Sequence, residues 1–90
     1  MAAPIRVLVV DDYDPWRRFI RLTLLAQERL QIVGEATDGP EALRQVQELQ
    51  PDLILLDIGL STSNGIEVAR HIRAVSPKSC ILFVSENRSL

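Results

Sequence analysis

The chain has 90 residues, of which 47% are hydrophobic and 24% are charged, and its formal net charge is −2. This profile is typical of one globular domain, so we expect a single domain over residues 1–90. The slight negative charge offers no attraction for a phosphate backbone, and direct nucleic-acid binding is not expected. No run reaches the about 18 apolar residues of a membrane span, and no signal peptide is evident. We therefore expect a cytoplasmic protein.

Two kinds of segment alternate along the chain. Short runs rich in Val, Ile and Leu predict strands, and longer stretches with apolar residues at every third or fourth position predict amphipathic helices. In chain order we expect a strand over 5–10, a helix over 14–29, a strand over 32–36, a helix over 39–49, a strand over 53–57, a helix over 64–75 and a strand over 80–84.

Each predicted helix begins at a residue suited to cap it. The first starts at Asp14 with Pro15 behind it, which is an acidic cap followed by a proline whose missing N–H costs nothing there. The second starts at Asp38, and Glu41 three residues later completes a capping box. Ser63 can cap the third helix.

The second and third helices each have an apolar face. We expect burial at Ala42, Leu43, Val46 and Leu49 of the second helix, at Ile66, Ala69 and Ile72 of the third, and at Cys80 of the last strand. Because Cys80 is the only cysteine, it forms neither an internal disulfide nor a cysteine metal site.

The alternation predicts an α/β fold, in which helices cover both faces of a parallel sheet. Sites in such sheets lie outside the carboxyl ends of the strands, where the strand order reverses. Asp11 and Asp12 follow the first predicted strand, and Asp57 ends the third. Three carboxylates at one edge repel one another unless a cation lies among them. We therefore predict a site for a hard divalent ion there.

These residues make the chain resemble the receiver domains of two-component response regulators, of the type attached to helix-turn-helix transcription factors. The resemblance covers nearly the whole chain. Its features are Asp11-Asp12 after the first strand, Asp57 after the third, Asn64-Gly65 seven and eight residues later, and Ser85 after the fourth. It implies a flavodoxin-like, doubly wound sheet with strand order 2-1-3-4, incomplete because the final helix, strand and helix of a full receiver are missing.

The resemblance also implies roles for individual residues. Asp57 would be phosphorylated by a histidine kinase in the presence of Mg²⁺. Asp12 and Asp57 would bind the ion directly, Asp11 through water, and Gly59 through its backbone carbonyl. This set suffices because Mg²⁺ usually keeps several waters. Ser85 would offer its hydroxyl to a phosphoryl oxygen and couple phosphorylation to the following segment.

Several positions depart from the family pattern. Ser61 replaces a usual proline and Ser63 a large apolar residue, so we expect a mobile loop there. Glu86 stands where a small residue is common, and its charge would slow access of a phosphodonor. The lysine of the family's fifth strand has no counterpart. Lys78 precedes the fourth strand, about 20 Å from the acids at ~3.3 Å per residue, and Arg88 is a poor substitute.

These departures leave two alternatives to a phosphoacceptor. A phosphorylation-independent interaction module is favoured if activity survives Asp57→Asn. A magnesium-dependent phosphohydrolase would release inorganic phosphate, but such enzymes carry a second aspartate where this chain has Gly59. We expect no enzyme activity. The apolar fourth strand would be a bare sheet edge, so we also expect marginal stability or self-association through it.

Overall fold

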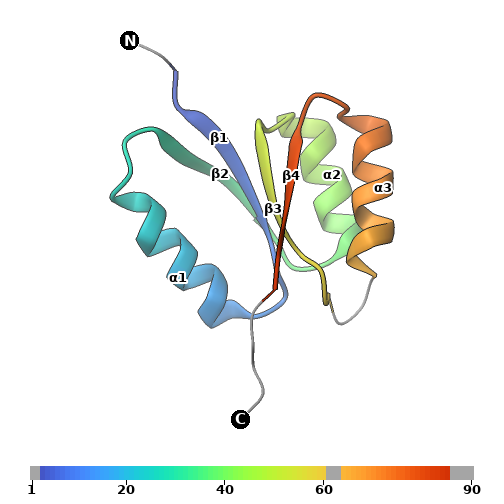
Figure 1. The fold of residues 1–90 in the computed structure, drawn as a ribbon, viewed down its shortest axis with the longest axis horizontal. Coiled ribbons are helices and arrows are strands. Elements are labelled where there is room, and N and C mark those ends of the chain that lie inside the picture. The colour runs from blue at the N-terminus through green and yellow to red at the C-terminus, as the bar shows by residue number, and fades with distance from the viewer. Residues whose placement is uncertain (1–2, 61–63, 86–90) are drawn as a thin grey trace.

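Four strands and three helices alternate in the part of the chain that the computed structural model describes, residues 3–60 and 64–85 (Figure 1). They are β1 (Ile5–Val10), α1 (Asp14–Leu25), β2 (Leu30–Ala36), α2 (Gly39–Leu49), β3 (Leu53–Asp57), α3 (Gly65–Val75) and β4 (Cys80–Val84). This order confirms the predicted alternation. Our expectations of a mobile loop at Ser61 and Ser63, and those for Glu86 and Arg88, fall outside the described residues.

The strands form one parallel sheet in the order β2-β1-β3-β4, which confirms the predicted α/β topology. In the register of the sheet, Val10 at the end of β1 lies beside Ala36 of β2 and Leu56 of β3. Asp57 lies beside Val84 at the end of β4. The carboxyl ends of all four strands therefore meet at one edge, where the acidic residues lie.

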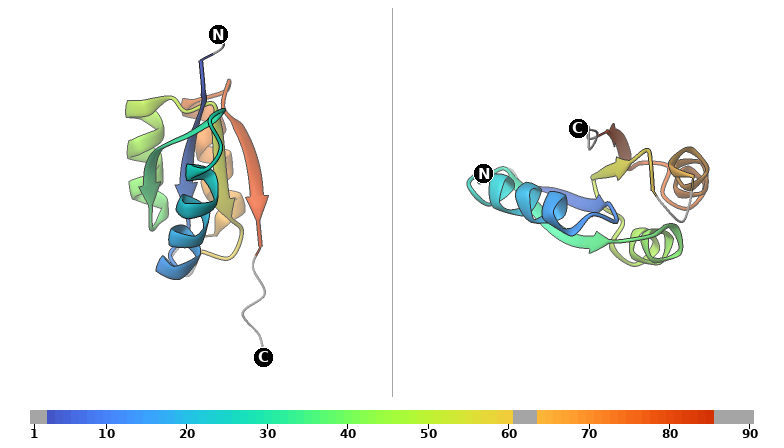
Figure 2. Two further views of the ribbon diagram at one scale, coloured as in Figure 1. Left: turned by 90° about the vertical axis from the view of Figure 1, so that its left-hand side faces the viewer. Right: turned by 90° about the horizontal axis from the view of Figure 1, so that it is seen from below.

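Helices cover both faces of the sheet, and β1 supplies side chains to both layers. Val7 and Val9 pack with Ile20 of α1 on one face. Leu8 and Val10 belong to the larger core cluster under α2 and α3 on the other. Of the helices in the described part of the chain, α1 lies on one side of the sheet, and α2 and α3 lie on the other (Figure 2). The face with a single helix is therefore the less covered one.

The start of α2 confirms Asp38 as the cap and differs from a full capping box in one bond, because Glu41 binds the N–H of Thr37 instead of that of Asp38. The Asp38 side chain accepts a hydrogen bond from the Glu41 N–H at 2.9 Å, and the Glu41 carboxylate accepts one from the Thr37 N–H at 2.9 Å. Ala42 and Val46 are fully buried, as their spacing predicts. These contacts fix the helix that lies beside α3 on the larger core.

The first helix differs from its prediction at both ends. It ends at Leu25 instead of residue 29, because Leu30 joins β2 beside Ile5 and the connection must turn before it. At its start Tyr13 holds the cap position without a side-chain cap bond. Asp14 lies in the first turn instead, where its carboxylate binds Arg17 at 2.8 Å.

The third helix is capped by Asn64, whose side chain accepts a hydrogen bond from the Ile66 N–H at 2.9 Å. The prediction of Ser63 as the cap was therefore wrong. The buried face of α3 consists of Val68, Ala69 and Ile72. Ile66 is 52% exposed, contrary to its predicted burial.

Ile66 and Cys80 are exposed at the β4 edge of the described sheet, on its two different faces. Side chains alternate along a strand, so Cys80 points to the opposite face from Ile81, and no described element covers either place. Cys80, predicted to be buried, is exposed on this strand. Ile66 lines a surface cavity together with Ile81 and Phe83 of the same strand. Apolar character predicted burial correctly only where a neighbouring layer is present.

Candidate functional site

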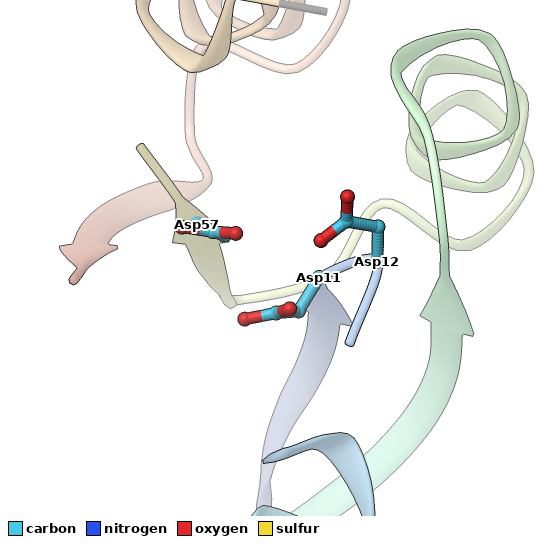
Figure 3. A group of neighbouring side chains, drawn as sticks. All are labelled: Asp11, Asp12 and Asp57. Atoms are coloured by element: carbon cyan, nitrogen blue, oxygen red, sulfur yellow. The ribbon is translucent and has the colours of Figure 1, made fainter. Parts of the chain in front are cut away.

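Three acidic side chains from two strand ends converge at the carboxyl edge of the sheet. Asp11 and Asp12 directly follow β1, and Asp57 is the last residue of β3. One carboxylate oxygen from each lies within 4.8 Å of the others. Asp11 and Asp57 are only 2% and 5% exposed, whereas Asp12 is half-buried. Figure 3 shows the three carboxylates turned toward one another.

Backbone N–H groups hold two of these carboxylates in place. The Asp11 carboxylate accepts a hydrogen bond from the Tyr13 N–H at 2.8 Å. The Asp57 carboxylate accepts one from the Gly59 N–H at 3.0 Å. Each bond spans two residues, so each acidic side chain closes its own tight turn after its strand. The oxygens are thereby aimed before any ligand binds.

The backbone of both turns is tied to the neighbouring strands. The Asp11 N–H donates to the carbonyl of Ala36 at the end of β2, at 3.0 Å. The Ile58 N–H donates to the carbonyl of Val84 at the end of β4, at 3.2 Å. The site therefore depends on the register of the whole sheet.

The start of α3 packs directly against the phosphoacceptor candidate. A Cβ atom added at Gly65 would lie 2.7 Å from the carbonyl oxygen of Asp57 and 2.8 Å from that of Ile58. Only a residue without a side chain allows this approach. The Asn64-Gly65 pair therefore caps α3 and lets it abut the turn after β3.

Arg17 contacts the backbone of the acidic turn, and no sequence motif pointed to this role. Its Nη1 donates to the carbonyl of Asp11 at 2.7 Å, and its side chain is only 11% exposed. Its other nitrogens lie 2.8 Å from Asp14 and 3.4 Å from Glu35. The three-residue spacing from Asp14 could have indicated a helical ion pair. The contact with Asp11 could not be predicted, because it depends on the turn at Tyr13.

Glu35 on β2 links this arrangement to a second arginine. Its two carboxylate oxygens accept hydrogen bonds from Arg21 at 2.8 and 2.9 Å. The hydrogen bond from Arg21 holds the pKa of the Glu35 carboxyl below its usual range, and burial opposes this shift. The pKa of Arg21 is raised for the same reason. The pair braces α1 against β2.

The remaining predicted site residues, Gly59 and Ser85, both follow strand ends at the acidic edge of the sheet. Ser85 is exposed and directly follows β4, whose last residue lies beside Asp57. Gly59 is exposed two residues after Asp57. Lys78 precedes β4, so it belongs to the amino end of that strand, away from the acids. A coordinating role for Gly59 and a phosphoryl contact for Ser85 stay predictions.

The donor set suits a hard divalent cation. Mg²⁺ prefers oxygen ligands and is commonly bound by one or two carboxylates with several waters. Asp11, Asp12 and Asp57 supply carboxylate oxygens close enough together to share one ion. A carboxylate such as that of Asp57 can also act as a nucleophile toward phosphorus.

Among the helices of the described residues, none has the length and apolar character needed to cross a membrane.

Comparison with known proteins gives a consistent match. Residues 7–90 match the family described as response regulator receiver domain. The chain is 40% identical over 81 residues to a protein-glutamate methylesterase/protein-glutamine glutaminase of Photobacterium profundum, covering 90% of this chain and 21% of that protein. It is 39% identical over 82 residues to the transcriptional regulatory protein LiaR of Bacillus subtilis, covering 90% and 39%.

The fold is similar to that of a solved two-component response regulator of the LuxR family from Aurantimonas sp. The TM-score is 0.87 at 31% sequence identity, and the alignment covers 97% of this chain and 62% of the other. The chain therefore spans less than two thirds of each of these proteins.

Proposed function

Because this chain belongs to the response regulator receiver domains, we propose that it is the phosphoacceptor of a two-component phosphorelay. A histidine kinase would transfer a phosphoryl group to Asp57 and thereby control a downstream output. The observation that carries the proposal is the convergence of the Asp11, Asp12 and Asp57 carboxylates within 4.8 Å at the carboxyl edge of the sheet.

The proposed chemistry uses few groups of the chain. A carboxylate oxygen of Asp57 attacks phosphorus while the bond from phosphorus to the donor nitrogen breaks, which leaves an acyl phosphate on Asp57 and a neutral histidine on the kinase. The Gly59 N–H donates a hydrogen bond to Oδ1 of this carboxyl group and thereby holds it in place. Ser85, at the end of β4, would donate its hydroxyl to a phosphoryl oxygen.

Asp12, Asp57 and the carbonyl of Gly59 would hold Mg²⁺ directly, and Asp11 would hold it through water. The ion supplies neutralisation of the negative charge on the phosphoryl oxygens. Asp11 serves this arrangement with a carboxylate that is already oriented by the Tyr13 N–H. Residues 1–90 would all belong to one receiver domain and work in the cytoplasm as a phosphoacceptor, without enzymatic turnover and without contacting nucleic acid themselves.

The chain covers only part of each relative, so the activities in the relatives' names are not part of the function that we propose for it. The methylesterase and glutaminase activity in the name of the Photobacterium protein belongs to a protein of which this chain covers only 21%. The match to a regulator of transcription is likewise limited to 39% of that protein. We include regulation of transcription in the proposal as the downstream output. Phosphorylation of this segment would be the signal that controls it.

The test is intact-mass analysis after incubation with acetyl phosphate and MgCl₂. We expect one hydroxylamine-sensitive phosphoryl adduct on the parent and none on Asp57→Asn. Asp52→Asn is the matched control, because Asp52 precedes β3 at the opposite end of the strand. This variant should form the adduct as the parent does. A parent that is folded by circular dichroism but gains no adduct would contradict the proposal.

That negative result would support a phosphorylation-independent interaction module. An output that survives Asp57→Asn in cells would point to the same module.

A further inference from the structure

The Arg17 guanidinium donates a hydrogen bond to the backbone of the acidic turn, at the carbonyl of Asp11. We propose that Arg17 is a positioning residue of the cation site, which holds the peptide between Asp11 and Asp12 in the orientation that binding requires. This inference rests on the proposed function, because it assumes that the three carboxylates bind Mg²⁺. It goes beyond that function by assigning a role to a residue that offers no ligand.

The guanidinium joins three parts of the fold. Nη1 donates to the Asp11 carbonyl at 2.7 Å, Nη2 to the Asp14 carboxylate at 2.8 Å, and Nε lies 3.4 Å from Glu35 on β2. Arginine suits this place because its planar fork presents five donors in fixed directions. The side chain is only 11% exposed, so neighbouring groups restrict its movement.

These bonds restrain Asp11 through its backbone as well as its side chain. Its N–H donates to Ala36, its carbonyl accepts from Arg17, and its carboxylate accepts from the Tyr13 N–H. The carbonyl of Asp11 and the N–H of Asp12 belong to the same planar peptide unit. Fixing that carbonyl therefore also fixes the direction in which the chain enters Asp12.

The charges around Arg17 allow this positioning without repelling a cation. Asp14 and Glu35 both bind the guanidinium, so two carboxylates outside the cluster offset its positive charge. The three acidic groups of the cluster therefore keep their attraction for a divalent ion. Such outer partners of metal ligands contribute to metal affinity although they do not touch the metal.

The experiment compares Mg²⁺ binding by the parent, Arg17→Gln and Arg18→Gln, using isothermal titration calorimetry with MgCl₂. We expect Arg17→Gln to weaken binding about tenfold, as is common when an outer partner of a metal ligand is removed. Arg18 is the matched control, because it is the next residue, is exposed, and carries the same charge. Its change should alter the Kd by less than about twofold, since exposed charges are well screened.

A second measurement needs no metal. Hydrogen exchange of the Tyr13 N–H, measured with EDTA present, reports on the turn that Asp11 closes. We expect faster exchange in Arg17→Gln and parent-like exchange in Arg18→Gln. A role limited to general stability would lower the melting temperature and leave the Kd of the folded protein unchanged, and that result would overturn the proposal.

Arg17→Lys decides the case in which Arg17→Gln does not fold. It keeps the charge, but one ammonium cannot reproduce the three-way fork, so we expect binding between that of the parent and that of Arg17→Gln. Parent-like affinity in a folded Arg17→Lys would overturn the inference alone. A parent that binds no Mg²⁺ would overturn the magnesium site of the proposed function and this inference with it.

Discussion

Gly65 shows how one residue type sets the distance between a helix and the site. The atoms nearest to its missing Cβ are backbone atoms of Asp57 and Ile58, at 2.7 and 2.8 Å, and backbone cannot move aside as a flexible side chain can. At Gly59, two residues after Asp57, an added Cβ would find its nearest neighbour at 3.8 Å. We therefore expect a side chain to be destabilising at Gly65 and tolerated at Gly59.

Gly65→Ala should lower the free energy of unfolding by about 1–3 kcal/mol, because the methyl group forces α3 away from the end of β3. It should also reduce formation of the phosphoryl adduct. Urea unfolding followed by circular dichroism measures the first effect. Gly59→Ala is the control and should leave stability within about 0.5 kcal/mol of the parent. Equal stability of the two variants would contradict the close approach.

Glu35 makes stability depend on pH in a definite direction. Its pKa is lowered mainly by the hydrogen bond from Arg21, so the folded state favours the ionised carboxylate. A lowered pKa adds stability above the usual glutamate value of about 4.3, and that stability is lost as the pH falls through the folded value. Arg17 and Arg21 of α1 are the cations that face this carboxylate.

Glu35→Gln should therefore be less stable than the parent at pH 7, and the difference should shrink as the pH falls below about 4. Urea unfolding at both pH values measures it. Glu48→Gln serves as the control, because Glu48 pairs with Arg44 at 3.4 Å on an exposed helix surface. It should change stability little at either pH. A difference for Glu35→Gln that is constant with pH would contradict this account.

Predicted burial was confirmed for some residues of α2 and α3 and not for others: Leu43 and Leu49 of α2 are only half-buried, and Ile66 of α3 is exposed. Ala42, Val46 and Ile72 are fully buried, as helical spacing indicates. Ile66 and Cys80 have equally apolar patterns but are exposed beside β4. Periodicity identifies the apolar face of an element. It does not reveal whether another element packs on that face.

At the scale of elements, β4 is an uncharged strand with one side of its backbone unpaired among the described residues. Its Leu82 and Phe83 are 53% and 45% exposed. Edge strands of this kind are open to pairing with a strand of another chain. We propose that the 90-residue chain associates with a second copy through β4.

Sedimentation velocity over a range of concentrations tests this proposal. The parent should show concentration-dependent dimers, and Leu82→Lys should shift the equilibrium toward monomer, because a charge on an edge strand opposes pairing. Leu25→Lys is the matched control, since Leu25 is 80% exposed on α1, away from β4. A monodisperse parent that melts cooperatively as a monomer would refute association through this edge.

Helix ends show which local signals were reliable. Asp38 caps α2 as predicted, because its bond to Glu41 lies within four residues of sequence. Asp14 does not cap α1, since the preceding turn is already closed by the bond from the Tyr13 N–H to Asp11. A cap predicted from local sequence was therefore confirmed at α2, and at α1 the turn that precedes the helix changed which residue holds the cap position.

For the whole molecule, the acidic cluster links stability to divalent cations. The three carboxylates repel one another in the metal-free protein, and a ligand that binds only the folded state stabilises it by mass action. At a Mg²⁺ concentration ten times the Kd, the expected gain is about 1.4 kcal/mol, or a rise in melting temperature of roughly 5–10 °C. EDTA should reverse it.

Differential scanning calorimetry with and without MgCl₂ measures this shift. Asp57→Asn should lose most of it, and in EDTA it should melt above the parent because one of three clustered charges is gone. Asp52→Asn, with its change at the other end of the sheet, should shift with Mg²⁺ as the parent does. An equal Mg²⁺ shift in parent and Asp57→Asn would place the ion elsewhere.

The sequence by itself determined the order of the elements, the parallel sheet and the edge at which Asp11, Asp12 and Asp57 meet. Those features follow from hydrophobic period and strand ends, which are local properties of the chain. The tertiary structure decided the clamp of Arg17 on the acidic turn, the close approach of Gly65 and the exposure of Ile66 and Cys80. Each of these depends on which elements lie side by side, and the periodicity of a sequence does not give the distances between elements.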